Sequence, residues 1–114
     1  QPQIYGDGDQ ARYFVFVDDV VEANLLAMTK GDGGAFNIGT GEKTSVNQIF
    51  ESLQRNIKYR WSAEHGPARQ GEVYKISLDS SKAVSALGWT PQVGMEEGLM
   101  QTVEFFRNAG KAVR

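Results

Sequence analysis

The chain has 114 residues, enough for one small domain, and its 40% hydrophobic and 23% charged content is ordinary for a globular protein. Twelve basic and fourteen acidic residues give a net charge of −2, which excludes a general electrostatic attraction to nucleic acid or acidic lipid. The absence of cysteine and the single histidine, His65, exclude disulfides, thiolate chemistry and histidine-rich metal sites.

No apolar run approaches the roughly twenty residues that a membrane crossing needs, and no signal peptide is recognisable at the start. We therefore expect a cytoplasmic protein with no membrane partner. The chain begins with Gln1 rather than methionine and opens almost directly on a motif, so we expect it to be a piece of a longer protein.

A glycine-punctuated turn at Gly6–Gly8 is the first feature in chain order, and Arg12 follows it closely. The β-branched and aromatic run 13–17 predicts a strand. Asp18 and Asp19 stand where a helix is expected to begin, and we interpret them as helix-capping residues rather than paired catalytic carboxylates. Arg12 is thus predicted to lie on a loop at the mouth of a strand, where it can meet a ligand.

The next segment predicts a helix and a strand. Residues 20–28 are apolar on more than one side, which predicts a helix covered on several faces. Residues 35–38 predict a short strand, and a strand reached from another strand through a helix suggests a parallel sheet. The remaining strands of that sheet would have to come from elsewhere.

A helix is predicted after Ser45, because Ser45 and Gln48 have the spacing of a capping box. Its apolar residues recur at helical spacing and predict one buried stripe. The residues of this stripe are Val46, Ile49, Phe50, Leu53 and Ile57.

The second half of the chain predicts strands at 58–63 and 74–78, separated by a loop at 64–73 that is rich in glycine and proline. In this loop His65 is expected to be solvated. A helix is predicted to end at Leu87 because Gly88 follows it.

A last helix is predicted at about 95–108, with Gly98 as its weak point. We expect it to bury Leu99, Val103 and Phe106, and we assign the Phe105–Phe106 pair to a core stripe.

We expect Arg12 and Arg69 to lie on two separate glycine-flanked loops. Exposed arginines are usually only solvated, but a guanidinium has a planar fork of donors that matches phosphate oxygens, which lysine lacks. Gly71 allows close approach of the backbone, and Glu72 offers a carboxylate suited to two vicinal ribose hydroxyls. These residues therefore predict a site for a nucleotide.

Four motifs occur in order: Tyr5–Gly8 with Arg12 and 17–20, then 36–41, then 66–72, then 87–91. The set resembles the extended short-chain dehydrogenase/reductases (SDRs) of the NAD-dependent epimerase/dehydratase family, and among them the UDP-glucose 4-epimerases most closely. The resemblance implies an α/β fold that corresponds to the C-terminal segment of an extended SDR, with the last Rossmann helix and parallel strand and the small mixed α/β substrate domain. Residues 1–114 would then form a single nucleotide-sugar-binding segment, without the N-terminal NAD-binding Rossmann part.

The resemblance also implies roles for individual residues. Arg12 and Arg69 fall on the two arginines that bind the diphosphate, and Glu72 falls on the acid that binds the uridine ribose. Tyr5 falls beside the uracil. The implied contacts of the UDP moiety are Tyr5, Arg12, Phe14, Val46, Arg69 and Glu72.

Catalysis in this superfamily uses a tyrosine base with a lysine four residues later. The four tyrosines of this chain are followed at that distance by Asp9, Val17, Ala63 and Leu78, so we expect no catalytic residue and no activity in this segment alone. Gly39–Thr44 is better explained as a turn after a strand than as a dinucleotide loop. NAD is therefore expected in the parent enzyme, with neither NAD nor a metal bound by this segment.

The preferred interpretation is the UDP-sugar-binding portion of an NAD-dependent UDP-hexose 4-epimerase, homodimeric as the parent. The resemblance implies that NAD takes hydride from C4 of the sugar while the tyrosine takes the hydroxyl proton. A dehydratase or a decarboxylating relative is the alternative within the family. From another class, the chain could be a non-catalytic binding module that swaps or oligomerises through the predicted edge strand 35–38.

Overall fold

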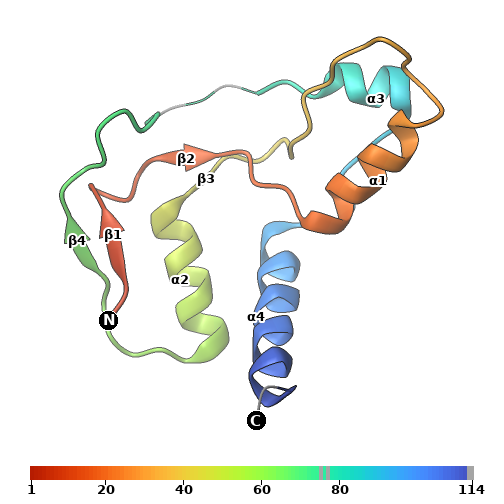
Figure 1. Cartoon of the computed structure of the whole chain (residues 1–114). Coiled ribbons are helices and arrows are strands. Elements are labelled where there is room, and N and C mark those ends of the chain that lie inside the picture. Colours follow the sequence, from red (N-terminus) through yellow and green to blue (C-terminus); the bar gives the residue numbers. More distant parts are fainter. Residues whose placement is uncertain (75, 77, 113–114) are drawn as a thin grey trace. The chain divides into compact units, whose positions relative to one another are not determined.

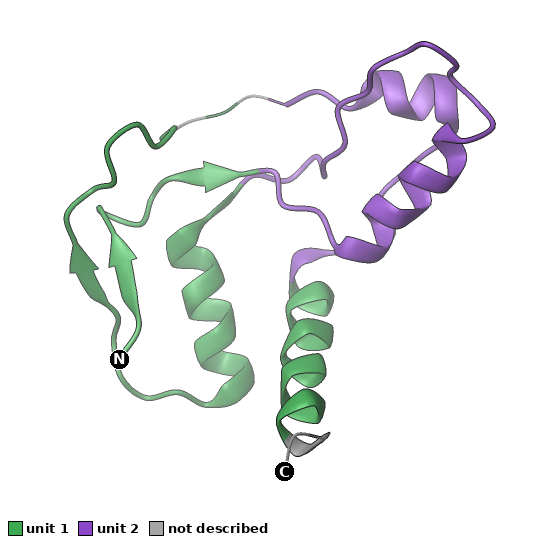
Figure 2. Ribbon diagram, viewed as in Figure 1, with its two compact units in different colours: residues 1–12, 44–76, 96–114 green, residues 13–43, 77–95 purple. Residues whose placement is uncertain are grey.

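The structure, a computed structural model, describes residues 1–74, 76 and 78–112. Helices and short strands both occur along the chain (Figure 1), so the predicted mixed α/β class is confirmed. The chain divides into two compact units (Figure 2): residues 1–12, 44–76 and 96–114 belong to unit 1, and residues 13–43 and 77–95 to unit 2. No helix within the described residues combines the length and the apolar character that a membrane crossing requires.

Unit 1 contains two strand pairs. Strand β1 (Gln3–Tyr5) pairs in parallel with β4 (Glu64–Gly66), and β2 (Ala11–Arg12) pairs in antiparallel with β3 (Thr44–Ser45). Each pair joins segments that are far apart in sequence, so the pairing draws the start of the chain against its middle.

Helix α2 (Val46–Ile57) follows β3 directly. The predicted capping box is confirmed, because the Gln48 backbone N–H donates to Ser45 Oγ at 3.1 Å and the Ser45 N–H donates to Gln48 Oε1 at 2.7 Å. Lys58 ends the helix in the left-handed conformation, with φ of 55°. The start of α2 is therefore fixed by its own sequence.

Helix α4 (Met95–Ala112) contacts α2 within unit 1 through Glu96, whose Oε1 accepts from Ser52 Oγ at 2.7 Å and from Arg55 Nη2 at 3.0 Å. Further along, the two helices border an open apolar groove of about 480 Å³. The residues that line the groove are Leu53, Ile57, Leu99, Thr102, Val103, Phe106 and Arg107.

The predicted burial along these helices is correct only in part. Leu99 and Val103 are half-buried, as are the first four residues of the α2 stripe, but Ile57 and Phe106 are exposed. Phe106 is 67% exposed and contacts Phe105 edge to face, with ring centroids 5.3 Å apart. The expectation of a core role for this pair is wrong, because Phe106 lines the open groove rather than a closed core.

Unit 2 contains α1 (Val17–Ala27) and α3 (Ser81–Leu87), packed around a small core. The predicted stop at Gly88 is confirmed, since Gly88 adopts φ of 69°. The core consists of Ala23, Ala83, Leu87 and Trp89, with Val15, Leu26, Phe36 and Ile38 packed against it.

Asp19 has a different role from the helix cap that we predicted. Helix α1 begins after Phe16, and among the described residues no side chain caps it. The Asp19 side chain is buried in the first turn instead, where its carboxylate accepts the backbone N–H groups of Gln92 at 3.0 Å and Val93 at 3.1 Å. Its backbone oxygen accepts from Trp89 Nε1 at 2.8 Å. Asp19 therefore anchors the loop after α3.

The strands predicted at 13–17 and 35–38 do not form. A strand needs a neighbouring backbone to pair with. In these two segments, side chains donate hydrogen bonds to some of the backbone carbonyl oxygens instead. Thr40 Oγ1 donates to the Phe14 oxygen at 3.0 Å, and Lys82 Nζ donates to the Ala35 oxygen at 3.0 Å. The edge strand through which we expected the chain to swap is thus not present in this part of the structure.

Two further strand assignments need correction. Residues 58–63 are not a strand, because this segment turns back on the end of α2: the Tyr59 N–H donates to the Gln54 oxygen at 3.1 Å, and Gln54 Nε2 donates to the Trp61 oxygen at 2.9 Å. The predicted loop begins instead with β4, which includes His65. For the predicted strand 74–78, residues 75 and 77 lie outside the described residues, and Tyr74, Ile76 and Leu78 belong to no strand.

Candidate functional site

The parallel pairing of β1 with β4 brings together the two chain segments that carry the candidate site, the turn after β1 and the loop after β4. Tyr5, the last residue of β1, lies opposite Gly66, the last residue of β4. The pairing continues one step further, since the Gly6 N–H donates to the Gly66 oxygen at 2.9 Å. Beyond this point each segment enters a turn or loop, and the two stay adjacent, since a Cβ placed on Gly6 would lie 3.5 Å from the Ala68 side chain.

The turn after β1 is held by side chains from within and outside it. Gly6 and Gly8 adopt φ of 78° and 80°, which confirms the predicted positive-φ turn. The Asp9 N–H donates to Asp7 Oδ1 at 2.9 Å, as in an Asx turn. Asn47 of α2 donates from Nδ2 to the Asp7 oxygen at 3.0 Å, and its backbone N–H donates to the Gly8 oxygen at 2.9 Å. The turn is therefore fixed against α2.

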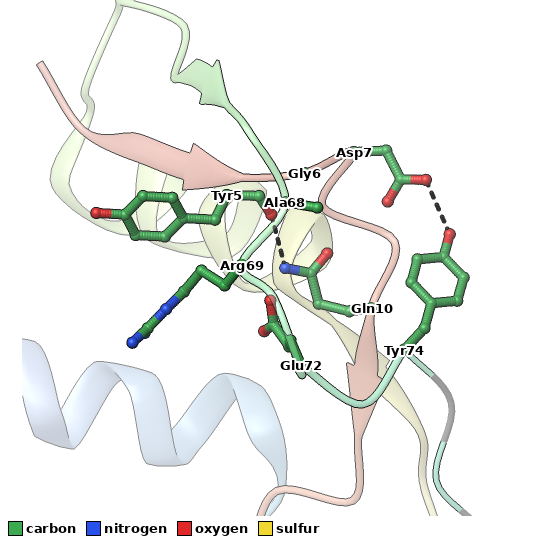
Figure 3. A pocket seen from close by; sticks show the side chains of 8 residues that line it. All are labelled: Tyr5, Gly6, Asp7, Gln10, Ala68, Arg69, Glu72 and Tyr74. Carbon is green, nitrogen blue, oxygen red and sulfur yellow. Dashed lines mark hydrogen bonds between the residues drawn. The ribbon is translucent and has the colours of Figure 1, made fainter.

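A cavity of about 80 Å³ lies between this turn and the loop after β4 (Figure 3). Tyr5 and Arg69 border it together, and Arg69 Cζ lies 5.6 Å from the centroid of the Tyr5 ring, in cation–π range. Both side chains are exposed, as is Glu72. The residues that line the cavity are Tyr5, Gly6, Asp7, Gln10, Ala68, Arg69, Glu72 and Tyr74.

Three of the six predicted ligand residues thus meet at one cavity: Tyr5, Arg69 and Glu72. They present an aromatic face, a cation and a carboxylate, which are the three chemical features that a base, a phosphate and a ribose require.

The other three predicted residues lie outside this cavity. Arg12 lies in β2 and not on a loop, so the predicted loop position is wrong; it is half-buried, and its Nη1 donates to the backbone oxygen of Ala11 at 2.8 Å. Val46 is the first residue of α2, and its N–H donates to the Gln10 oxygen at 3.1 Å. Phe14 belongs to unit 2 and is exposed. A ligand role for these three residues stays a prediction.

Three polar side chains of the cavity wall were missed by sequence reasoning: Asp7, Gln10 and Tyr74. Gln10 is buried, and its Nε2 donates to the Tyr5 oxygen at 2.9 Å. Tyr74 Oη donates to Asp7 Oδ2 at 2.9 Å. The glycine-flanked Asp7 was a usable signal for a turn at a site, but no local pattern pairs it with Tyr74.

These contacts shift two pKa values. The hydrogen bond from the Asp9 backbone, followed by that from Tyr74, lowers the pKa of Asp7. The hydrogen bond to the Asp7 carboxylate is the main cause that raises the pKa of Tyr74. The carboxylate therefore stays ionised and the phenol stays protonated at neutral pH.

His65 lies on β4 rather than in a loop. Its Nδ1 is 2.9 Å from the Gly6 oxygen, to which it donates when Nδ1 carries the proton. The side chain is exposed, as predicted. Within the described residues, no three histidine, aspartate or glutamate side chains gather in a group that could bind a metal ion.

Comparisons with known proteins show where this chain belongs. A family model described as GDP-mannose 4,6 dehydratase matches residues 1–102. A putative UDP-glucose 4-epimerase from Methanocaldococcus jannaschii is 45% identical over 107 residues, which cover 94% of this chain and 34% of that protein.

Two solved structures are also similar. The UDP-glucose 4-epimerase from Thermotoga maritima, solved with UDP-glucose, has a TM-score of 0.93 at 51% identity and covers 96% of this chain. MoeE5, in complex with UDP-glucuronic acid and NAD, has a TM-score of 0.87 at 38% identity and covers 94% of this chain. The chain spans about a third of the length of these relatives, 34% to 36%.

The fold and these matches define a member of the extended short-chain dehydrogenase/reductases. Within that class, the chain belongs to the family of nucleotide-sugar epimerases and dehydratases.

Proposed function

We propose that this chain is the C-terminal, nucleotide-sugar-binding portion of an NAD-dependent UDP-hexose 4-epimerase. The observation that carries the proposal is the cavity at which Tyr5, Arg69 and Glu72 meet, since these residues come from segments far apart in sequence. The similarity to epimerases supports the same reaction class.

In the proposed site each group of the ligand has a matching side chain. The Arg69 guanidinium binds the diphosphate with its fork of N–H donors, with Arg12 as the second cation. The Glu72 carboxylate accepts from the two ribose hydroxyls. The Tyr5 ring contacts the uracil, and Val46 supplies a lesser contact. The contribution of this chain to the reaction is to bind and orient the nucleotide while the sugar reacts elsewhere.

NAD, which is bound in the similar MoeE5 structure, supplies the hydride chemistry of such an enzyme, but the described residues do not offer a dinucleotide loop for it. The glycine-rich segment Gly39–Thr44 is the candidate. A dinucleotide loop needs a glycine against which a pyrophosphate can lie, whereas the Gly39 backbone is covered by the Leu78 side chain and its oxygen accepts from Ser80 Oγ at 3.2 Å. We therefore assign NAD to residues outside this chain, and we expect the chain alone to have no activity.

Arg69→Ala tests the proposal in the complete natural protein. We expect this substitution to weaken UDP binding at least about tenfold, because an ion pair at a partly screened site contributes a few kcal/mol before desolvation. Isothermal titration calorimetry measures the dissociation constant.

Arg60→Ala is a matched control, since Arg60 is also an exposed arginine near an aromatic ring, 5.4 Å from the Trp61 centroid, and it does not line the cavity. We expect this control to leave UDP affinity unchanged. Equal affinity of the Arg69→Ala variant and the natural protein would rule out the proposed role.

A dehydratase is the second candidate, because the matching family model is described as one. The mass of the product separates the two. An epimerase returns a UDP-sugar of unchanged mass, whereas a dehydratase product has lost one water.

A further inference from the structure

The loop that carries Arg69 and Glu72 has little support from burial. Every residue from Pro67 to Tyr74 is exposed. Inside the loop, the Glu72 N–H donates to the Arg69 oxygen at 3.3 Å, and Gly71 adopts φ of 81°. An exposed loop of this kind loses conformational entropy when a ligand orders it, unless contacts at its ends have already fixed it.

Tyr74 supplies such a contact at the far end of the loop. Its Oη donates to Asp7 Oδ2 at 2.9 Å, and its backbone oxygen accepts from the Ala11 N–H at 3.3 Å. Figure 3 shows the phenol and the Asp7 carboxylate facing each other at the rim of the cavity. The near end of the loop is held by the pairing of β4 with β1.

The acceptor of this bond is itself fixed by hydrogen bonds from residues outside the loop. Asp7 Oδ1 accepts from the Asp9 N–H, and the Asp7 backbone oxygen accepts from Asn47 Nδ2. The free carboxylate oxygen, Oδ2, is therefore in a defined position. A bond from Tyr74 to this oxygen fixes the loop against the turn that carries Tyr5.

We propose that Tyr74 is a positioning residue for nucleotide binding. Its hydrogen bond to Asp7 fixes the loop 67–74 in the conformation in which Arg69 and Glu72 border the same cavity as Tyr5. Tyr74 acts through the loop and need not touch the ligand. This inference rests on the proposed function, because it concerns the same UDP site.

Tyr74→Phe in the complete natural protein is the test, since it removes the hydroxyl and keeps the ring. We expect UDP affinity, measured by calorimetry, to fall about fivefold, in line with the net contribution of one hydrogen bond. Tyr59→Phe is the control: Tyr59 belongs to the same unit, contacts Phe50 and Trp61, and does not line the cavity. We expect this control to leave the affinity unchanged.

A double-mutant cycle with Arg69→Ala distinguishes positioning from a general structural effect. If Tyr74 acts through the loop, the loss caused by Tyr74→Phe becomes smaller once the Arg69 side chain is gone. An unchanged affinity in the Tyr74→Phe variant, or an equal loss in both backgrounds, would overturn the inference while the proposed function stands. Failure of the natural protein to bind UDP would overturn the proposed function itself.

Discussion

Asp19 contacts three positions in the loop after α3, and it does so from a buried site. The carboxylate accepts two backbone N–H groups, those of Gln92 and Val93. Asp19 lies in the first turn of α1, and the residue is only 4% exposed. Removing the carboxylate would leave two backbone N–H donors of unit 2 without their acceptor. A buried donor without an acceptor lowers the stability of the fold when water does not replace the lost hydrogen bond.

Asp19→Ala is therefore expected to lower the free energy of unfolding by about 2 kcal/mol. Urea denaturation followed by circular dichroism measures this loss. Asp18→Ala is the neighbouring control, because Asp18 is exposed in the same helical turn, and its expected effect is below about 0.5 kcal/mol. A similar loss in both variants would contradict the anchoring role of Asp19.

Individual residues of the candidate site were predictable only where the residue type itself signals a ligand. Arg69 and Glu72 lie three residues apart in one glycine-containing loop, and their side-chain types suit a phosphate and a ribose. Tyr5 was selected only through the family resemblance. Tyr74 and Asp7 meet through a hydrogen bond that spans 67 positions of the chain. No local pattern encodes that contact, and the β-branched character around Tyr74 favoured a strand instead.

At the scale of elements, α2 is the segment whose start depends most directly on its own sequence. Ser45 and Gln48 satisfy each other's backbone N–H groups, which are otherwise unpaired at a helix start. The antiparallel contact of β3 with β2 places Ser45 opposite Ala11, so the cap also fixes the point at which the chain leaves the strand.

Ser45→Ala is expected to reduce the free energy of unfolding by about 1 kcal/mol, the usual contribution of a serine cap. Thermal or urea unfolding of the variant gives the value. Ser62→Ala offers a control at an exposed serine outside the helices, for which we expect almost no change. Equal free energies of unfolding for the two variants would show that the Ser45 cap does not stabilise the fold.

Helices were predicted better than strands, for a physical reason. The caps and stops of α2 and α3 are local, because Ser45, Gln48 and Gly88 act within one or two turns of their own helix. The strands depend on distant partners. The polar segment Glu64–Gly66 becomes β4 because β1 lies beside it, whereas the apolar segment 35–38 has no strand partner among the described residues and stays irregular.

For the whole molecule, the exposed apolar side chains are notable because the chain spans about a third of its relatives. Helix α1 exposes Val17, Val21 and Leu25, and α4 exposes Met100 and Phe105. The sequence predicted that this helix is covered on several faces, but Val21, Leu25 and Met28 are exposed, so the described residues do not provide that covering. Such faces are typical of surfaces that pack against further polypeptide.

The proposed function requires the side chains that we assign to the nucleotide to converge on one ligand. A crystal structure of the complete natural protein with UDP tests this directly. We expect the diphosphate oxygens to lie within about 3.2 Å of the guanidinium nitrogens of Arg69 and Arg12, with the ribose hydroxyls on Glu72 and the uracil beside Tyr5. UDP bound at another surface, with Arg69 and Glu72 free of it, would contradict the account.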